Sequence, residues 1–466
     1  MFEILARNGT GRDNMRDTDK RLSFGEKAGW GLADMGIVVF VIIKQLLVLS
    51  FLTNYLGVPV AIAGMVTTGV LFFDMITDPL IGYLSDKTKT RWGRRAPWMF
   101  VGALVLAAGT VGIFGVPEKF DLTNKILWVS GFFILATIGF TMVAIPYGAT
   151  SGEMTQNSKE RSAIMGFRMA FASLGILLGG AVIPQLAGGT REGHLSAAII
   201  IAPIMVLAIW GSIWLTRKTP RIMEPSRENS WEMASLVWNN TPFMILVVLY
   251  GVMTLAVALI TAGLPFAAMY LILDNGETML SSVASGLGVL SLMFAAFVLG
   301  AILSQVFWVW LSAKFGKTSA LISGLLLYII LLVVIYRALP AVNVTASAGL
   351  FMLAGMTNGA YQQIPWAIYP DLMDITRTKT GAAIEGAFSA VWLFGQKFAN
   401  ALAPSLLAFI LSIYGWRETT QGITEQLPEA INALHMSITI VPSAILAMAI
   451  LGLIFIYRRS LASNEG

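Results

Sequence analysis

Two aspartates in the first part of the chain are spaced to share one bound ion. Asp74 and Asp78 lie four residues apart within a long apolar segment, and this spacing puts both carboxylates on one face of a helix. Two carboxylates this close cannot both ionise cheaply without a cation between them, so one takes a proton or both share Na⁺. Pro79 follows directly, and its missing N–H can leave a carbonyl free as a further ligand. The pair therefore predicts a cation site. The alternative is that Asp78-Pro79 ends a turn and Asp74 pairs with a lysine.

Other ionisable residues also lie within apolar segments, where a charged side chain at a helix centre costs about 2.5–3.5 kcal/mol on insertion scales. They are Asp34, Lys44, Arg168, Glu385 and Lys397. Gln45 follows Asp34 by 11 residues, which places it on the same face of an α-helix as one wall of a solute cavity, with Lys44 at its edge. Lys44 would anchor a solute or pair with a carboxylate. Arg168 would hold a solute hydroxyl or anion through its guanidinium, or close a gate, and Lys397 would have a functional or a structural role.

The elements that must position these residues are membrane-spanning helices. Of the 466 residues 56% are hydrophobic and only 12% charged, whereas soluble domains carry roughly 25% charged residues. This composition excludes a soluble enzyme and a disordered chain, and the absence of cysteine excludes a disulfide scaffold. A bilayer core needs roughly 20 mostly apolar residues per helix. Such stretches lie near 28–55, 60–84, 97–116, 126–147, 163–188, 195–216, 242–273, 283–311, 319–337, 346–368, 382–413 and 435–457.

These twelve stretches form two groups of six. The predicted organisation is a cytoplasmic N-terminal segment (1–27), a first half (28–216), a central cytoplasmic loop (217–241), a second half (242–457) and a cytoplasmic tail (458–466). Of the 31 Lys and Arg residues, 23 fall in the termini and even-numbered loops and only 5 in the odd-numbered loops. Because positive charge favours the cytoplasmic side, both termini are predicted to be cytoplasmic. The net charge of +5 therefore reflects topology, and no nucleic-acid partner is expected.

Short motifs recur between the two groups at similar distances. The matched segments are Gly82–Asp86 with Leu311–Lys317, Ile145-Pro146-Tyr147 with Ile364-Pro365-Trp366, and Glu153-Met154 with Asp371-Leu-Met-Asp374. Two six-helix halves related by such a repeat build the major facilitator architecture, with solute and ion sites between the halves near mid-membrane. We therefore predict an all-α membrane protein with twelve transmembrane helices in two six-helix halves.

A further set of charged residues is predicted to act in gating or in structure. These residues are Asp86, Arg94, Arg95, Asp371, Asp374 and Glu385. Asp86 lies with Arg94 and Arg95 at the predicted cytoplasmic end, where charge pairing would latch the two halves together.

The sequence resembles the glycoside–pentoside–hexuronide:cation symporters, the melibiose permease family. The segments that carry the resemblance are Phe73–Gly82, Arg91–Trp98, Gly31–Asp34, Ile145–Tyr147, Glu160-Arg161 with Arg168, Asp371–Asp374, and Glu385 with Lys397. The resemblance implies that Asp74 and Asp78 bind the coupling cation together with Thr141. It also implies that Asp34 and Arg168 contact the sugar, and that Lys397 links the halves near both sites.

The match breaks at three positions. The family's aspartate before the Ile-Pro of the fourth span is Ala144 here, its sugar-stacking tryptophan is Gly148, and the lysine before Asp34 is Ala33. Losing one oxygen ligand weakens a Na⁺ site more than a proton site, so H⁺ coupling is favoured over Na⁺. Losing the aspartate and the aromatic platform argues against a galactoside. With Lys44, Arg168 and Lys397 nearby, an anionic solute such as a hexuronide or a sulfonated sugar is credible.

The sequence thus predicts a secondary active transporter that moves a sugar or a sugar-derived solute with a cation by alternating access. The alternative is a cation-coupled carrier of a lipid-like or other amphipathic solute. An enzyme is not expected, because the chain has only two histidines, His194 and His435, and no cysteine. No organic cofactor is expected, and Asp74 and Asp78 would bind a metal ion only if Na⁺ is the coupling ion. We expect a monomer in the bacterial inner membrane, with lipid and a small solute as its partners.

Overall fold

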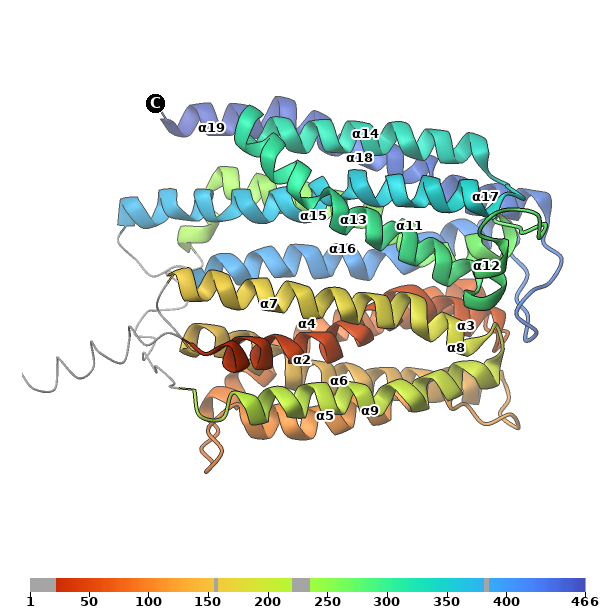
Figure 1. The fold of residues 1–466 in the computed structure, drawn as a ribbon, viewed down its shortest axis with the longest axis horizontal. Helices are drawn as coiled ribbons and strands as arrows, with labels where there is room; N and C mark the ends of the chain where they lie inside the picture. Colours follow the sequence, from red (N-terminus) through yellow and green to blue (C-terminus); the bar gives the residue numbers. More distant parts are fainter. Residues whose placement is uncertain (1–21, 155–157, 220–234, 381–384, 466) are drawn as a thin grey trace, which may run out of the picture.

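The computed structural model describes residues 22–154, 158–219, 235–380 and 385–465. The regular structure of these ranges is helical, apart from one isolated bridge between Ile272 and Ala341. The helices run side by side along the long axis of the molecule, and α2 begins at the end where α19 finishes (Figure 1). We call this end the terminal end and the other one the opposite end.

The helices of the first half occupy the lower part of Figure 1. Their bounds are α2 Phe24–Ile42, η1 Ile43–Leu47, α3 Val48–Asn54, α4 Val60–Lys87, α5 Ala96–Phe114, α6 Leu122–Met154, α7 Ser158–Leu177, η2 Leu178–Val182, α8 Ile183–Ala187 and α9 Arg191–Leu215. The bounds in the second half are α11 Thr241–Tyr270, α12 Ser281–Leu287, α13 Val289–Phe315, α14 Lys317–Ala338, α15 Val344–Thr380, α16 Glu385–Ile413, α17 Pro428–Ile438, α18 Ile440–Gly452, η3 Leu453–Tyr457 and α19 Arg458–Glu465.

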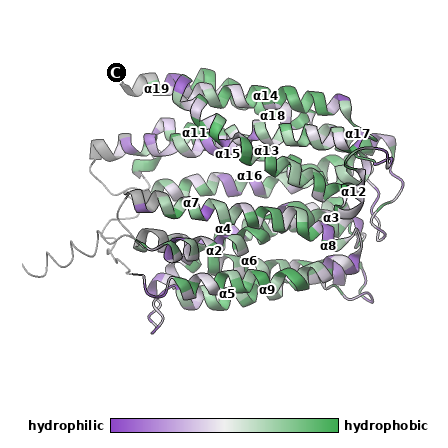
Figure 2. Cartoon of the chain, in the orientation of Figure 1, coloured by the Kyte–Doolittle hydropathy of each residue, from purple (hydrophilic) through white to green (hydrophobic). Residues whose placement is uncertain are grey.

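The predicted spans correspond to helices of this bundle. Eleven helices or helix runs in the described residues are long and apolar enough to cross a membrane by length and composition. The remaining predicted span, the tenth at 346–368, lies in α15, which is 37 residues long but is not among the eleven. Asn358, Gln362 and Gln363 lower the hydropathy of its middle part. Figure 2 shows a similar difference in hydropathy among the other helices. The helices α9 and α14 are mostly apolar, whereas polar residues interrupt the central α16.

The first span departs from the predicted geometry. Between α2 and α3 the backbone forms a π-helical turn, η1, at Ile43–Leu47. A π turn has i→i+5 hydrogen bonds and so inserts one residue into the α-helical register. The assumption of unbroken α-helical spacing from Asp34 to Gln45 is therefore wrong, and Gln45 is half-buried within the turn itself.

The two halves pack closely along α4 and α16. Thr68 of α4 donates its hydroxyl hydrogen to the carbonyl of Ala401 at 2.7 Å, and Ser405 donates to the carbonyl of Gly64 at 3.1 Å. A Cβ atom at Gly64 would collide with the side chain of Ala408, so glycine permits this close approach.

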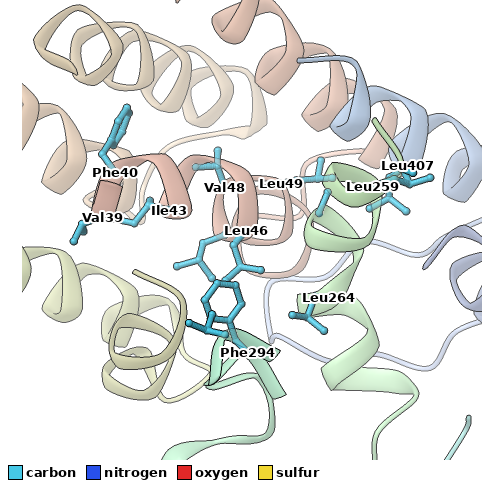
Figure 3. Close-up of a cluster of buried hydrophobic side chains, with 14 of the residues drawn as sticks. Val39, Phe40, Ile43, Leu46, Val48, Leu49, Leu259, Leu264, Phe294 and Leu407 are labelled. Atoms are coloured by element: carbon cyan, nitrogen blue, oxygen red, sulfur yellow. The ribbon is translucent and has the colours of Figure 1, made fainter. Parts of the chain in front are cut away.

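A second contact between the halves is apolar. Figure 3 shows Leu46 of η1 beside Phe294 of α13, with Leu264 of α11 nearby. Leu46 is fully buried, and Leu264 and Phe294 are 6% exposed. The ring of Phe294 also fills the space where a side chain at Gly180 would lie. We call Leu46, Leu264 and Phe294 the apolar plug.

Candidate functional site

Four charged side chains meet between the halves and form a charge cluster. Lys44 of η1 contacts Asp74 of α4 with 3.2 Å between Nζ and Oδ2. Lys397 of α16 lies 3.2 Å from the same Asp74 oxygen and forms a close ion pair with Asp78. Asp74 is 2% exposed and Lys44 is 6% exposed. Charges this deeply buried need partners, and two ammonium groups here balance two carboxylates.

Neutral groups complete the cluster. Thr141 of α6 lies 3.0 Å from an Asp74 oxygen and 3.3 Å from an Asp78 oxygen, so its hydroxyl can donate to either carboxylate. The face of the Phe140 ring lies 4.3 Å from the Lys44 ammonium and 5.7 Å from that of Lys397. Both distances are within the range of cation–π attraction. Thr141 is thus adjacent to both carboxylates, and its role as a cation ligand stays a prediction.

The cluster bears directly on the predicted cation site. Asp74 does pair with lysines, which was the alternative from the sequence, but it also shares Thr141 with Asp78. Within the described residues, no group of three or more His, Cys, Asp or Glu side chains could hold a metal ion. An entering cation would therefore meet two carboxylates, one hydroxyl and two positive charges. Cation binding at Asp74 and Asp78 stays a prediction.

A second ion pair joins α2 to α7, closer to the terminal end than the charge cluster. Arg168 of α7 contacts Asp34 with 3.1 Å between Nε and Oδ2. The Asp34 side chain is 5% exposed, whereas the Arg168 side chain is 37% exposed. The Arg168 guanidinium also lies 5.9 Å from the centre of the Tyr147 ring. The pair therefore combines a fixed buried carboxylate with an accessible guanidinium.

Close helix packing positions this pair. A Cβ atom at Gly31 would lie 2.9 Å from the backbone of Phe167, and one at Gly175 would lie 2.6 Å from the carbonyl oxygen of Met35. Both glycines therefore let α2 and α7 approach each other closely on either side of Asp34. The ring of Trp30 stacks on that of Tyr147 with 4.6 Å between centroids, and its Nε1 donates to the hydroxyl of Thr150 at 2.9 Å. Tyr147 is thereby held under the Arg168 guanidinium.

The predicted gating residues form pairs within single halves. Asp86 contacts Arg95 at 3.0 Å, which joins the end of α4 to the residue before α5. Lys317 of α14 contacts Asp371 of α15 at 2.5 Å. Neither pair itself crosses between the halves. Arg94 directly precedes Arg95, and Asp374 lies three residues after Asp371. Glu385 begins α16, and its side chain lies outside the described part of the structure.

The sequence analysis missed an aromatic cluster in the second half. Trp392 of α16 stacks on Tyr250 of α11 at 4.3 Å and on Tyr369 of α15 at 5.1 Å. Trp366 of α15 donates its Nε1 hydrogen to the Tyr250 hydroxyl at 3.0 Å and is 40% exposed. The Ile364-Pro365-Trp366 repeat was the signal that could have found it, since its counterpart contains Tyr147.

Two halves of membrane-spanning helices, with buried and balanced charges between them, define a secondary transporter fold. The family model described as MFS/sugar transport protein matches residues 29–460. The chain therefore belongs to this family of transporters, and the resemblance to the glycoside–pentoside–hexuronide:cation symporters is confirmed.

The chain is similar to relatives over most of their length and of its own. It is 25% identical to a glucuronide carrier protein homolog of Escherichia coli, over 92% of each chain. It is 24% identical to sodium-dependent lysophosphatidylcholine symporter 1 of Xenopus tropicalis, over 86% of this chain and 81% of that one. A crystal structure of a bacterial homolog of the human lysosomal transporter Spinster has a TM-score of 0.64 at 14% identity, covering 94% and 97% of the two chains. This structural likeness supports the fold alone.

Proposed function

We propose that this protein is a cation-coupled symporter of a sugar or a sugar-derived solute. The observation that carries the proposal is the charge cluster, in which Lys397 of the second half is bound to Asp74 and Asp78 of the first. Ten residues separate Asp34 from Lys44, or about 15 Å along the helix axis. The solute pair Asp34–Arg168 and the charge cluster are therefore close enough to influence each other through the first span.

Coupling would follow from competition for the two carboxylates. In the empty carrier the Lys397 ammonium holds the halves together by binding Asp78. A cation that binds or protonates Asp78 weakens this ion pair and allows the halves to move. If solute bound to Arg168 favours the same rearrangement, each ligand raises the affinity of the other, as linkage requires.

The coupling ion proposed here is H⁺ rather than Na⁺. Lys44 and Lys397 already balance the charges of Asp74 and Asp78. A proton and a sodium ion would each add one positive charge to the cluster, but a sodium ion also needs several oxygen ligands. A proton needs a single carboxylate oxygen of Asp78, and Ala144 supplies no further carboxylate ligand for a metal ion.

The solute proposed for the central site is a sugar that includes anionic forms such as a hexuronide. The accessible Arg168 guanidinium presents N–H donors to hydroxyl or carboxylate oxygens. Tyr147 is buried under Trp30, so it offers no open ring face. The exposed ring of Trp366 is the aromatic platform available in the second half. A lipid-like solute, which the name of one relative specifies for that relative, is the second candidate.

The setting proposed for this activity is the bacterial inner membrane, with both termini in the cytoplasm and the monomer as the working unit. The chain is a multi-pass membrane transporter by family, and its small-molecule solute is its functional partner. We propose no catalytic activity and no organic cofactor.

Uptake into proteoliposomes tests the proposal. Radiolabelled methyl glucoside, glucuronate and lysophosphatidylcholine would each be offered under an imposed H⁺ gradient or an imposed Na⁺ gradient. We expect accumulation of a sugar or sugar acid with the H⁺ gradient. Accumulation of the lysolipid alone would replace the sugar by the second candidate, and a requirement for Na⁺ would overturn H⁺ coupling.

The Asp78→Asn variant tests the role of the carboxylate. It should abolish accumulation against a gradient while leaving exchange of solute across the membrane, because the cation step is removed and the solute pair is intact. The matched control is Asp121→Asn, since Asp121 is an exposed loop residue that accepts a hydrogen bond from the backbone of Asn124. Undiminished accumulation by Asp78→Asn would contradict the proposal.

A further inference from the structure

A separate cavity lies between the halves at the opposite end of the molecule. Its volume is about 560 Å³, within the roughly 300–1,000 Å³ range of small-molecule sites. The first half contributes α3, α8 with the turn after it and the start of α9, and the second half contributes α11, α12, the start of α13 and the loop before α17. The lining residues used below are Ser50, Tyr55, His194, Asp274, Ser285 and Ser291.

The apolar plug separates this cavity from the charge cluster. Along the first span, Lys44 belongs to the charge cluster, Leu46 to the plug, and Ser50 to the cavity wall. Figure 3 shows Leu46 of the first half beside Phe294 of the second at this level, and both belong to the buried apolar cluster. The cavity is therefore not part of the site that contains Asp34, Arg168 and the charge cluster.

Two polar groups in the wall are suited to a ligand. The Ser291 hydroxyl is buried, and it has no hydrogen-bond partner among the described residues. Leaving such a group unpaired costs about 1–3 kcal/mol, which a ligand oxygen would recover once the Ser291 side chain turns toward the cavity that its residue lines. The His194 ring is held by its Nδ1, 2.6 Å from the carbonyl oxygen of Thr190, and it packs beside the ring of Tyr55 at 4.6 Å. In the described part of the chain, its Nε2 has no hydrogen bond of its own.

The charge of the wall excludes an anion as the preferred ligand. No Lys or Arg lines the cavity within the described residues, and Asp274 is the acidic residue in its wall. One Asp274 oxygen accepts hydrogen bonds from the hydroxyl of Ser281 at 2.6 Å and from the backbone N–H of Gly276 at 3.1 Å. Serine hydroxyls, the imidazole and the tyrosine ring together form a surface for a neutral molecule with several hydroxyl groups.

We propose that this cavity is an outer binding site for a neutral, hydroxyl-rich solute of the sugar class, which we call the outer site. The inference rests on the proposed sugar transport for its biological role. Solute would bind Ser291 and His194 at the outer site and pass to Arg168 when the apolar plug parts. Because the outer site lacks the basic groups of the central one, the two sites would differ in their preference for anions.

Thiol labelling tests the outer site directly, because the natural chain has no cysteine. Ser285→Cys places a single thiol in the cavity wall, and Ser282→Cys places one on an exposed position of the same helix that does not line the cavity. Both would be combined with Arg168→Ala, which disables the central site. The purified variants would then react with a charged methanethiosulfonate reagent, with or without methyl β-glucoside or glucuronate.

Methyl β-glucoside should protect the thiol at position 285 and leave the thiol at 282 unaffected. A probe at four times its Kd leaves about one fifth of the sites free, so labelling should slow about fivefold. Glucuronate should protect less, and adding Ser291→Leu, which fills the cavity, should remove the protection. The outer site is overturned if position 285 shows no saturable protection, if Ser282→Cys slows equally, or if Ser291→Leu leaves the protection intact.

This experiment is independent of transport. Protection at position 285 without sugar uptake by the wild-type protein would refute the proposed function and leave the outer site standing. Sugar uptake without protection would refute the outer site and leave the proposed function standing.

Discussion

The two halves of the molecule handle polar groups in different ways. In the first half, Asp34, Asp74 and Asp78 are each neutralised by a basic residue within the protein. In the second half, the equivalent central region is occupied by stacked aromatic rings around Trp392, and its contribution to the charge cluster is Lys397. The repeat therefore preserves the helices but not the side-chain chemistry at their centre. The first half holds the paired carboxylates, and the second supplies stacked aromatic rings and the Lys397 ammonium.

Lys44→Met should have the largest effect on the stability of the first half. Lys44 pairs with Asp74 inside the first half and is almost fully buried. Removing one partner of a buried ion pair typically costs about 3 kcal/mol or more. We expect the largest loss of thermal stability in detergent for this variant, and partial recovery in Lys44→Met/Asp74→Asn, which removes both charges. Lys119→Met, at an exposed position, is the control. Equal melting temperatures for Lys44→Met and the control would show that Asp74 does not depend on Lys44.

Lys397→Met tests the contact between the halves. Its side chain is 28% exposed, so the stability cost should be smaller than for Lys44→Met, about 1–3 kcal/mol for the carboxylate left unpaired. The larger consequence should be on transport, with loss of gradient-driven accumulation. Stability by thermal unfolding and uptake by proteoliposomes would be measured on the same preparation. If Lys397→Met accumulates solute normally, the ion pair across the halves is not part of coupling.

Trp366→Leu tests the aromatic surface of the second half. If the exposed ring stacks on the solute, its removal should weaken binding by about 1 kcal/mol, or about fivefold in Kd. Trp310→Leu is the control, because Trp310 is also exposed but belongs to none of the clusters described. Calorimetric titration with the transported sugar would measure both. An unchanged Kd in Trp366→Leu would remove this half from solute recognition.

Thr141→Val should give the smallest loss of stability among the three changes within the charge cluster. The threonine hydroxyl lies 3.0 Å from Asp74 and 3.3 Å from Asp78, and a single hydrogen bond to a charged group contributes about 1.5–3 kcal/mol. The Lys44 and Lys397 ion pairs remain, so we expect a decrease near the lower end of this range in unfolding experiments. Thr141→Ser keeps the hydroxyl and should behave as wild type. A larger loss than in Lys44→Met would reverse the ranking of charge over hydrogen bonding.

Much of this arrangement was predictable from the sequence because it follows from hydropathy and charge. The spans and their grouping into halves depend on local composition, and Asp74 and Asp78 share a face through helical spacing alone. The partners of these residues were less predictable. From the sequence, Lys44 could bind either a solute or a carboxylate. The packing of η1 against α4 in the structure identifies its partner as Asp74.

The features missed from sequence depend on contacts between distant segments. The π turn at Ile43–Leu47 has no sequence signature of its own, so spacing arguments across it fail. The aromatic cluster draws Tyr250, Trp366 and Trp392 from three helices. Aromatic residues are common in membrane spans for other reasons, so composition alone could not single these out.

The π turn also makes the first span sensitive to length in an unusual way. Asp34, before the turn, contacts Arg168 within the first half, whereas Lys44 and Leu46, inside the turn, belong to the charge cluster and the apolar plug. Because a π turn winds its extra residue into a wider turn, deleting one residue between positions 43 and 47 would restore a continuous α-helix and leave the flanking segments facing nearly the same way. The deletion would instead leave one side chain fewer at the level where the charge cluster meets the plug, so Lys44 or Leu46 would lose its present position. The extra residue thus gives one level of a single helix room for both a charged and an apolar contact.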